Sequence, residues 1–78
     1  MPPSDRQPDW VIARRWAIGD RIRATRLHAN LTQERLAELA GIDRQAVNRI
    51  EQGHASPKLD TLIRLAAALD TRLRDLVE

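Results

Sequence analysis

The chain has 78 residues, of which 42% are hydrophobic and 31% charged, with a formal net charge of +2 and no cysteine. For a chain of this length we expect one small core and no separate ligand-sensing domain. The lack of cysteine excludes disulfides, zinc fingers and thiol catalysis. The apolar stretches fall far short of the ~20 residues that span a bilayer, and residues 1–10 lack the apolar segment of a signal peptide. We therefore expect a cytoplasmic protein.

Charge is distributed unevenly along the chain. Residues 1–30 carry a net charge of +3, residues 31–58 are neutral, and residues 59–78 carry −1. A protein that binds nucleic acid only through its phosphates would be more basic, because that affinity comes from released counterions. All basic residues except Lys58 are arginine, whose planar guanidinium matches guanine and phosphate. The base composition of the genome alone can also cause this predominance of arginine over lysine.

The first elements in chain order are a tail and a long helix. Residues 1–8 contain three prolines together with Ser, Asp and Gln, which predicts a disordered tail. A helical pattern then covers residues 9–28. Ile18 and Ile22 are spaced i, i+4 and form one core-facing stripe, with Val11 roughly in line behind them.

Two short helices follow, with a glycine between them. Thr32 has a capping hydroxyl and begins a helix that Gly41 ends, because this turn requires positive φ. Asp43 is the next N-cap and predicts a helix over residues 44–52, with Gly53 after it.

Two more helices are predicted in the last third of the chain. Ser56 and Pro57 form a start signal, a capping hydroxyl followed by proline at the first helical position. Apolar residues then recur with a 3.6-residue period until residues 70–71 break it. The members of this stripe are Leu59, Leu62, Ile63, Ala66 and Leu69. A last short helix contains Leu73, Leu76 and Val77. No segment alternates with period two over the length of a strand, so we expect a five-helix, all-α domain.

The two short helices and their glycine turn predict a helix-turn-helix. Ala37 suits a tight contact between the helices, and Val47 and Ile50 form the buried face of the second one. The polar side chains left on the other face are Arg44, Gln45, Asn48 and Arg49. Arginine can bridge guanine O6 and N7, and Gln45 or Asn48 can bridge adenine N6 and N7. On an arbitrary helix such residues would only be solvated.

The segment from Ile18 to Val77 resembles the Cro/C1-type helix-turn-helix family of phage repressors and bacterial regulators, also called the xenobiotic-response-element family. The matching segments are IGDRIRATR, LTQERLAELAGI, DRQAVNRIEQG and SPKLDTLIRLAAALD. The resemblance implies a lambda repressor-like DNA-binding domain over residues 18–78, with residues 9–17 as a helical extension of its first helix. Residues 1–17 lie outside the resemblance and inherit no role from it.

The resemblance also implies which side chains contact DNA. The expected base contacts are Arg44, Gln45 and Asn48, with Arg49 at the edge of the major groove. Gln33, at the start of the helix before the turn, would order its amide against a phosphate, where the helix N-terminus adds partial positive charge. The expected phosphate contacts are Thr32, Gln33, Gln52, His54, Ser56 and Lys58.

A structural ion pair between Arg26 and Glu51 is a further implication of the resemblance. The family often pairs an arginine late in the first helix with a glutamate at the end of the recognition helix, partly buried. Removing one partner leaves a desolvated charge, which costs about 3–5 kcal/mol. We therefore expect this pair to hold the domain together.

Trp10 and Trp16 are the only aromatic residues, and both precede the family pattern. Trp16 lies ~160° around the helix from the core stripe, near the azimuth of Leu27. This second apolar face meets another protein, folds back onto the domain, or is exposed on a frayed extension. We favour an interface, since tryptophan is common at interface hot spots. Arg14 and Arg15 either contact DNA beside the site or lie in solvent.

Two functions fit these features. The first is a sequence-specific transcriptional regulator that binds double-stranded DNA as a homodimer, expected to be a repressor and nucleoid-associated when bound. Its dimer surface is either the face of Trp10 and Trp16 or the C-terminal residues Leu73, Leu76 and Val77. The alternative is an antitoxin-type protein that autoregulates its operon and binds a partner protein through the Trp10/Trp16 extension.

Catalysis, a cofactor, a metal and a small-molecule ligand are not expected. Such sites need convergent polar groups in a pocket. The sequence has no metal-spaced histidine pair and no phosphate-binding glycine loop, and its three glycines suit turns or caps.

Overall fold

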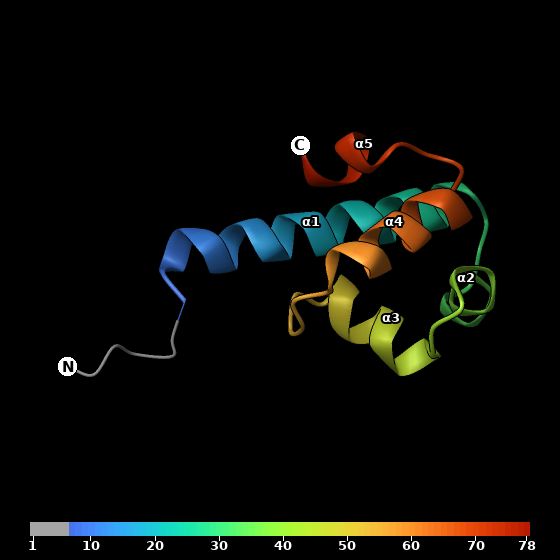
Figure 1. The fold of residues 1–78 in the computed structure, drawn as a ribbon, viewed down its shortest axis with the longest axis horizontal. Helices are drawn as coiled ribbons and strands as arrows, with labels where there is room; N and C mark the ends of the chain where they lie inside the picture. The colour runs from blue at the N-terminus through green and yellow to red at the C-terminus, as the bar shows by residue number, and fades with distance from the viewer. Residues whose placement is uncertain (1–6) are drawn as a thin grey trace.

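The computed structural model describes residues 7–78, which contain five helices and no strand. The helices are α1 (Asp9–His28), α2 (Gln33–Ala40), α3 (Arg44–Glu51), α4 (Leu59–Ala68) and α5 (Leu73–Val77) (Figure 1). This confirms the five-helix, all-α prediction. The tail predicted over residues 1–8 lies outside the described residues, except for Gln7 and Pro8, which precede α1 without regular structure.

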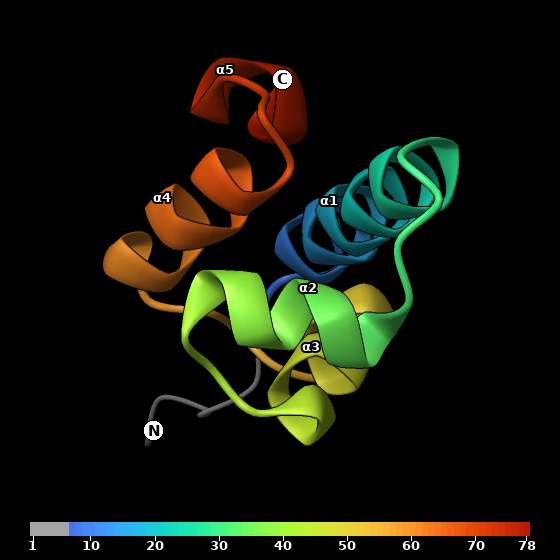
Figure 2. The same cartoon turned by 90° about the vertical axis from the view of Figure 1, so that its right-hand side faces the viewer.

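The helices are arranged around the C-terminal part of α1. α3 packs against α1 and α2, α4 packs against α2 and α5, and α5 packs against α1. Figures 1 and 2 both show α3 and α5 on opposite sides of the molecule. The N-terminal turns of α1 extend beyond the other helices (Figure 1). No helix within the described range has the length and apolarity needed to cross a membrane.

α1 is one uninterrupted helix, so the predicted extension over residues 9–17 and the first helix of the domain are continuous. Ile22 is fully buried, Ile18 packs against the core, and Val11 is half-buried. The predicted core stripe is therefore confirmed. Gly19 is buried in the middle of α1, which corrects the expectation that every glycine lies in a turn or a cap.

Side-chain caps begin both α2 and α3. The Oγ of Thr32 accepts a hydrogen bond from the backbone N–H of Arg35 at 3.0 Å, and Asp43 Oδ1 accepts one from the N–H of Ala46 at 2.8 Å. Between the helices, Gly41 has a φ of 73°. These contacts confirm the predicted caps and the glycine turn, because each depends on chemistry within a few residues.

The start of α4 differs from the prediction. The sequence favours Ser56 and Pro57 as its first residues, but α4 begins at Leu59, and its N-cap residue Lys58 makes no side-chain capping bond. Pro57 is half-buried and lines the same cavity as Ile50. The proline therefore precedes the helix and lines this cavity with Ile50, and the chain is extended at Lys58 before the helix begins.

One fully buried large side chain from each helix forms the centre of the core. These residues are Ile22, Leu36, Val47, Leu65 and Leu76. Burying each such side chain contributes about 1.5–3 kcal/mol relative to leaving it exposed. Because every helix supplies one of them, the core depends on all five helices.

α4 carries two apolar stripes that periodicity alone does not separate. Leu65, Ala66 and Leu69 are buried, whereas Leu59 and Ile63 are 62% and 49% exposed. The apolar period predicted from the sequence therefore includes two residues, Leu59 and Ile63, that do not face the core. In the single chain, only one of these two apolar faces of α4 is packed against other helices.

The C-terminal residues expected as a dimer surface belong mostly to the core of the single chain. Leu76 is 1% exposed, and Leu73 and Val77 are half-buried and pack against the core. The side chain of Leu76 is therefore covered within the single chain, whereas Leu73 and Val77 remain partly exposed, so a C-terminal dimer surface stays a prediction for these two residues only.

Candidate nucleic-acid interface

The turn between α2 and α3 determines how these helices meet. Gly41 adopts the left-handed conformation, and the N–H of Ile42 donates to the carbonyl of Ala37 at 3.0 Å. Glycine adopts this conformation without steric cost. Ala37 and Ala40 are buried, and their small side chains let the helices approach closely. The result is a helix-turn-helix, as the sequence predicts.

α3 presents a polar face to solvent. Val47 and Ile50 are buried and hold α3 against the rest of the molecule. The polar face consists of exposed Arg44, Gln45 and Arg49 with half-buried Asn48. The first turn of α3 lies at the side of the molecule away from α5 (Figures 1 and 2). The side chains expected to contact bases therefore share one accessible helix face.

A buried ion pair joins the last turn of α3 to α1. Arg26 Nε donates to Glu51 Oε2 at 2.7 Å, and Arg26 Nη2 donates to Glu51 Oε1 at 3.1 Å. The two side chains are 8% and 1% exposed. Arg26 Nη1 also donates to the carbonyl of Leu31 at 2.8 Å, which holds the loop before α2. The ion pair expected between these residues is present.

The amide of Gln33 extends this network to the polar face of α3. Gln33 Nε2 donates to Glu51 Oε1 at 3.0 Å and to Asn48 Oδ1 at 3.1 Å. Gln52 Nε2 lies 3.5 Å from the same Asn48 oxygen. Sequence reasoning missed these bonds, because it considered Gln33 and Asn48 as separate DNA contacts. Only the packing of α2 on α3 brings the two side chains together.

The side chains expected to contact phosphate lie in two places. Thr32 and Gln33 begin α2, and the others are exposed in the loop between α3 and α4. Those loop residues are Gln52, His54, Ser56 and Lys58. The Thr32 oxygen accepts the capping bond and keeps its O–H free to donate. Both amide hydrogens of Gln33 are engaged inside the protein, so a phosphate contact by this amide requires the release of one bond.

Comparison with known proteins identifies the fold. A family model described as helix-turn-helix matches residues 22–76. The chain belongs to the helix-turn-helix family. It is 41% identical over 59 residues to the antitoxin HigA1 of Mycobacterium tuberculosis, a match that covers 76% of this chain and 40% of the antitoxin. It is 37% identical over 60 residues to the control protein C.SmaI of Serratia marcescens, covering 77% of this chain and 71% of that protein.

A solved structure supports the same assignment. The restriction-modification controller protein C.AhdI of Aeromonas hydrophila matches this helix-turn-helix chain with a TM-score of 0.81 at 39% identity. The match covers 82% of this chain and 97% of C.AhdI. These similarities confirm the Cro/C1-type helix-turn-helix identification. The chain spans only about 40% of the length of HigA1.

The part of α1 that precedes the family match contacts the end of the helix-turn-helix at Gly53. The indole of Trp16 covers Gly53 so closely that a Cβ on Gly53 would lie 2.9 Å from the indole Cγ. Arg15 Nε donates to the carbonyl of Gly53 at 2.9 Å, and Arg14 Nη2 donates to that of Val77 at 2.8 Å. Trp16 thus packs in part within the chain, but it is 55% exposed, so the interface favoured from the sequence stays a prediction. Arg14 and Arg15 bind the ends of other helices.

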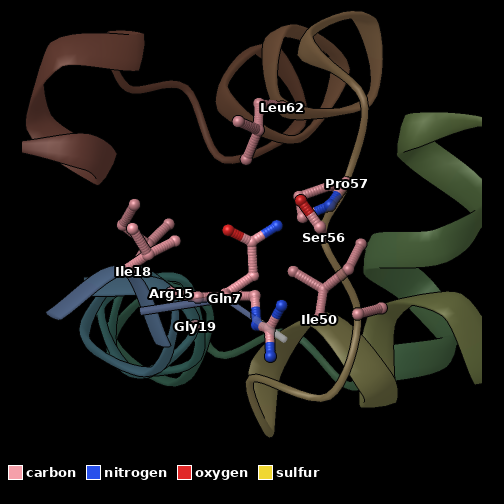
Figure 3. A pocket seen from close by; sticks show the side chains of 10 residues that line it. Gln7, Arg15, Ile18, Gly19, Ile50, Ser56, Pro57 and Leu62 are labelled. Atoms are coloured by element: carbon pink, nitrogen blue, oxygen red, sulfur yellow. The ribbon is translucent and has the colours of Figure 1, made fainter. Parts of the chain in front are cut away.

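A cavity of about 180 Å³ separates the N-terminal half of α1 from the end of α3 and the start of α4 (Figure 3). Its apolar lining includes Ile18, Ile50 and Leu62, and the side chains of Gln7 and Arg15 project toward it. Because Ile50 lines it, the cavity lies on the buried side of α3 and not on the polar face. Arg15, which lines this cavity, also donates to the carbonyl of Gly53 and so joins the extension to the end of the helix-turn-helix.

Proposed function

We propose that the chain is a repressor that reads a specific double-stranded DNA sequence by inserting α3 into the major groove. The observation that supports this proposal most strongly is the polar face of α3. Arg44 and Gln45 carry groups that match base edges, and they lie in the exposed first turn of the helix. Buried Val47 and Ile50 fix the opposite face, so α3 can enter a groove without leaving the domain.

Phosphate contacts would lie on both sides of α3. The start of α2 offers the O–H of Thr32 next to the partial positive charge of a helix N-terminus. The loop after α3 offers three exposed donors, which are His54, Ser56 and Lys58. Such contacts position a recognition helix on the duplex and carry no sequence information themselves.

The proposed regulator acts as a homodimer. One recognition helix reads only a few base pairs, whereas two helices about 34 Å apart read both halves of a palindrome. Leu59 and Ile63 are spaced i, i+4 on α4 and leave an exposed apolar stripe. We assign the dimer contact to this stripe, in place of the two surfaces considered from the sequence, the C-terminal residues and the face of Trp10 and Trp16.

An antitoxin is the second candidate function. It is favoured by the similarity to HigA1 and by Trp10, which is 71% exposed where α1 extends beyond the other helices (Figure 1). In this role the helix-turn-helix represses its own operon, and the extension binds a partner protein. Trp16 contributes less to such a surface than expected, because part of its indole covers Gly53. Neither candidate includes catalysis, a cofactor or a small-molecule ligand.

Binding-site selection from a random duplex library, at near-physiological salt, tests the main proposal. Wild type should enrich a palindromic motif, and Arg44→Ala/Gln45→Ala should lose it, because each good bidentate contact gives ~1–3 kcal/mol of discrimination. Arg74→Ala is the matched control, since it removes one exposed positive charge from α5, on the opposite side of the molecule. It should keep the motif.

Two results would contradict the proposal. One is the absence of any enriched motif with a folded wild-type protein. The other is a motif that survives unchanged in the Arg44→Ala/Gln45→Ala variant. Copurification of wild type with a second protein, lost on Trp10→Ala, would instead support the antitoxin function.

A further inference from the structure

The charge of Glu51 fixes the direction of the hydrogen bonds around it. Its oxygens receive Nε and Nη2 of Arg26 and Nε2 of Gln33. A carboxylate has no hydrogen to donate. The group of Gln33 that faces Glu51 must therefore be its NH2 and not its carbonyl oxygen.

The orientation of Gln33 in turn fixes the amide of Asn48. The second hydrogen of the Gln33 NH2 needs an acceptor, and Asn48 Oδ1 lies 3.1 Å from the nitrogen. Gln52 approaches the same oxygen at 3.5 Å, which is long for a hydrogen bond. Turning the Asn48 amide over would place two NH2 groups against each other and lose the bond from Gln33. The oxygen of Asn48 thus faces α2, and its NH2 is the group left for another partner.

We infer that Asn48 acts in the major groove as a hydrogen-bond donor only, and so selects guanine at the base pair it faces. The inference rests on the proposed function. Guanine presents two adjacent acceptors, O6 and N7, whereas adenine presents N7 beside a donor, thymine one acceptor, and cytosine a donor alone. An asparagine that bridges adenine turns both its amide oxygen and its NH2 toward the base, whereas the oxygen of Asn48 faces α2.

This assignment corrects the expectation that either Gln45 or Asn48 bridges adenine. Gln45 is exposed in the first turn of α3 and keeps that capacity. Gln33 becomes a positioning residue, because it determines which group Asn48 presents. Its role differs from a general phosphate contact, which would alter affinity for all sequences alike.

The test is binding-site selection with wild type and three variants. Asn48→Ala identifies the base pair read by Asn48, as the position where the preference disappears. Wild type selects guanine there. Gln33→Ala releases the Asn48 oxygen, so adenine gains on guanine by about tenfold. Asn48→Asp keeps the bond from Gln33 and turns an acceptor toward the groove, which moves the preference to cytosine.

Glu34→Ala is the control, because Glu34 is exposed in the same turn as Gln33 and lies outside the network. It should leave the base preference unchanged. Circular dichroism establishes folding, and if Gln33→Ala does not fold, Asn48→Asp decides the question. If wild type selects adenine at this position, or if the folded variants keep the same preference, this inference is wrong but the proposed function is not affected. Failure of wild type to enrich any motif is a different result, which removes the proposed function and this inference with it.

Discussion

Gly19 of α1 lies directly against the backbone carbonyl of Ile50 in the last turn of α3. A Cβ added at Gly19 would meet that oxygen and would lie 2.8 Å from the next carbonyl oxygen, that of Glu51. Both atoms belong to the backbone, so neither can give way unless a helix shifts. Gly19 therefore sets the separation between α1 and the helix proposed to read DNA.

Gly19→Ala tests this close contact, because the contact decides whether the substitution raises or lowers the free energy of unfolding. Glycine inside a helix normally costs about 0.5–1 kcal/mol relative to alanine, so this replacement would ordinarily stabilise. Here we expect the free energy of unfolding to fall by about 1–3 kcal/mol, as for other overpacked sites. Urea denaturation followed by circular dichroism measures the change.

Ala24→Gly is the control for helix propensity, because Ala24 is exposed on the same helix. Ala24→Gly should lower the free energy of unfolding by about 0.8–1 kcal/mol. A stabilised Gly19→Ala variant beside a normal loss for Ala24→Gly would mean that α1 and α3 do not touch at Gly19.

Arg26→Ala should greatly destabilise the domain. The substitution leaves the carboxylate of Glu51 buried without its cation, which costs about 3–5 kcal/mol. A domain of this size has a total stability on the order of 4–12 kcal/mol. The variant should therefore unfold at much lower urea concentration than wild type.

The control for this prediction is an exposed ion pair. Arg35 and Glu38 lie 3.1 Å apart, with side chains 58% and 60% exposed. Arg35→Ala should change stability by at most ~1 kcal/mol, because solvent screens such pairs. Wild-type stability of Arg26→Ala would show that the buried pair does not support the fold.

Local chemistry explains what the sequence could predict. Thr32 and Asp43 act as caps through bonds to residues three positions away, so their neighbours in sequence are sufficient to identify them. The ion pair of Arg26 and Glu51 joins distant segments, and the resemblance to a family supplied it. The helix-turn-helix is predicted both from local capping and turn residues and from the resemblance to the family.

Long-range packing explains what the sequence could not predict. Periodicity gives the spacing of Leu59 and Ile63 but not the side of α4 that meets α2, so their exposure depends on the assembled bundle. Gly19 is recognisable as a contact site only once α3 lies against it. The same holds for Gln33 and Asn48, whose bond requires α2 and α3 to be in place.

Gly53 and Gly41 form a matched pair that isolates the contact with Trp16. Their φ values are 74° and 73°, so the backbone strain of an alanine is similar at the two positions, about 1–2 kcal/mol. A Cβ at Gly41 would meet only Arg64 Nη1, at 3.6 Å, whereas one at Gly53 would meet the indole of Trp16. Gly53→Ala should therefore lower the free energy of unfolding by at least about 1 kcal/mol more than Gly41→Ala does.

Tryptophan fluorescence gives an independent measure of this displacement. In a Trp10→Phe background, emission comes from Trp16 alone. Gly53→Ala should shift that emission to the red as the indole, already 55% exposed, moves further into solvent, and Gly41→Ala should not. Equal losses of stability with unchanged emission would show that the extension does not pack on Gly53.

Ile63→Glu should separate the proposed dimer without unfolding the chain. Ile63 is 49% exposed beside Leu59 on α4, so the free monomer tolerates glutamate, whereas a dimer contact would bury the carboxylate. We expect the dissociation constant, measured by sedimentation equilibrium, to rise about a hundredfold or more. Leu27→Glu is the matched control, because Leu27 is 48% exposed on α1 and should not affect assembly. If Ile63→Glu stays dimeric while Trp10→Ala dissociates, the extension of α1 carries the contact between chains.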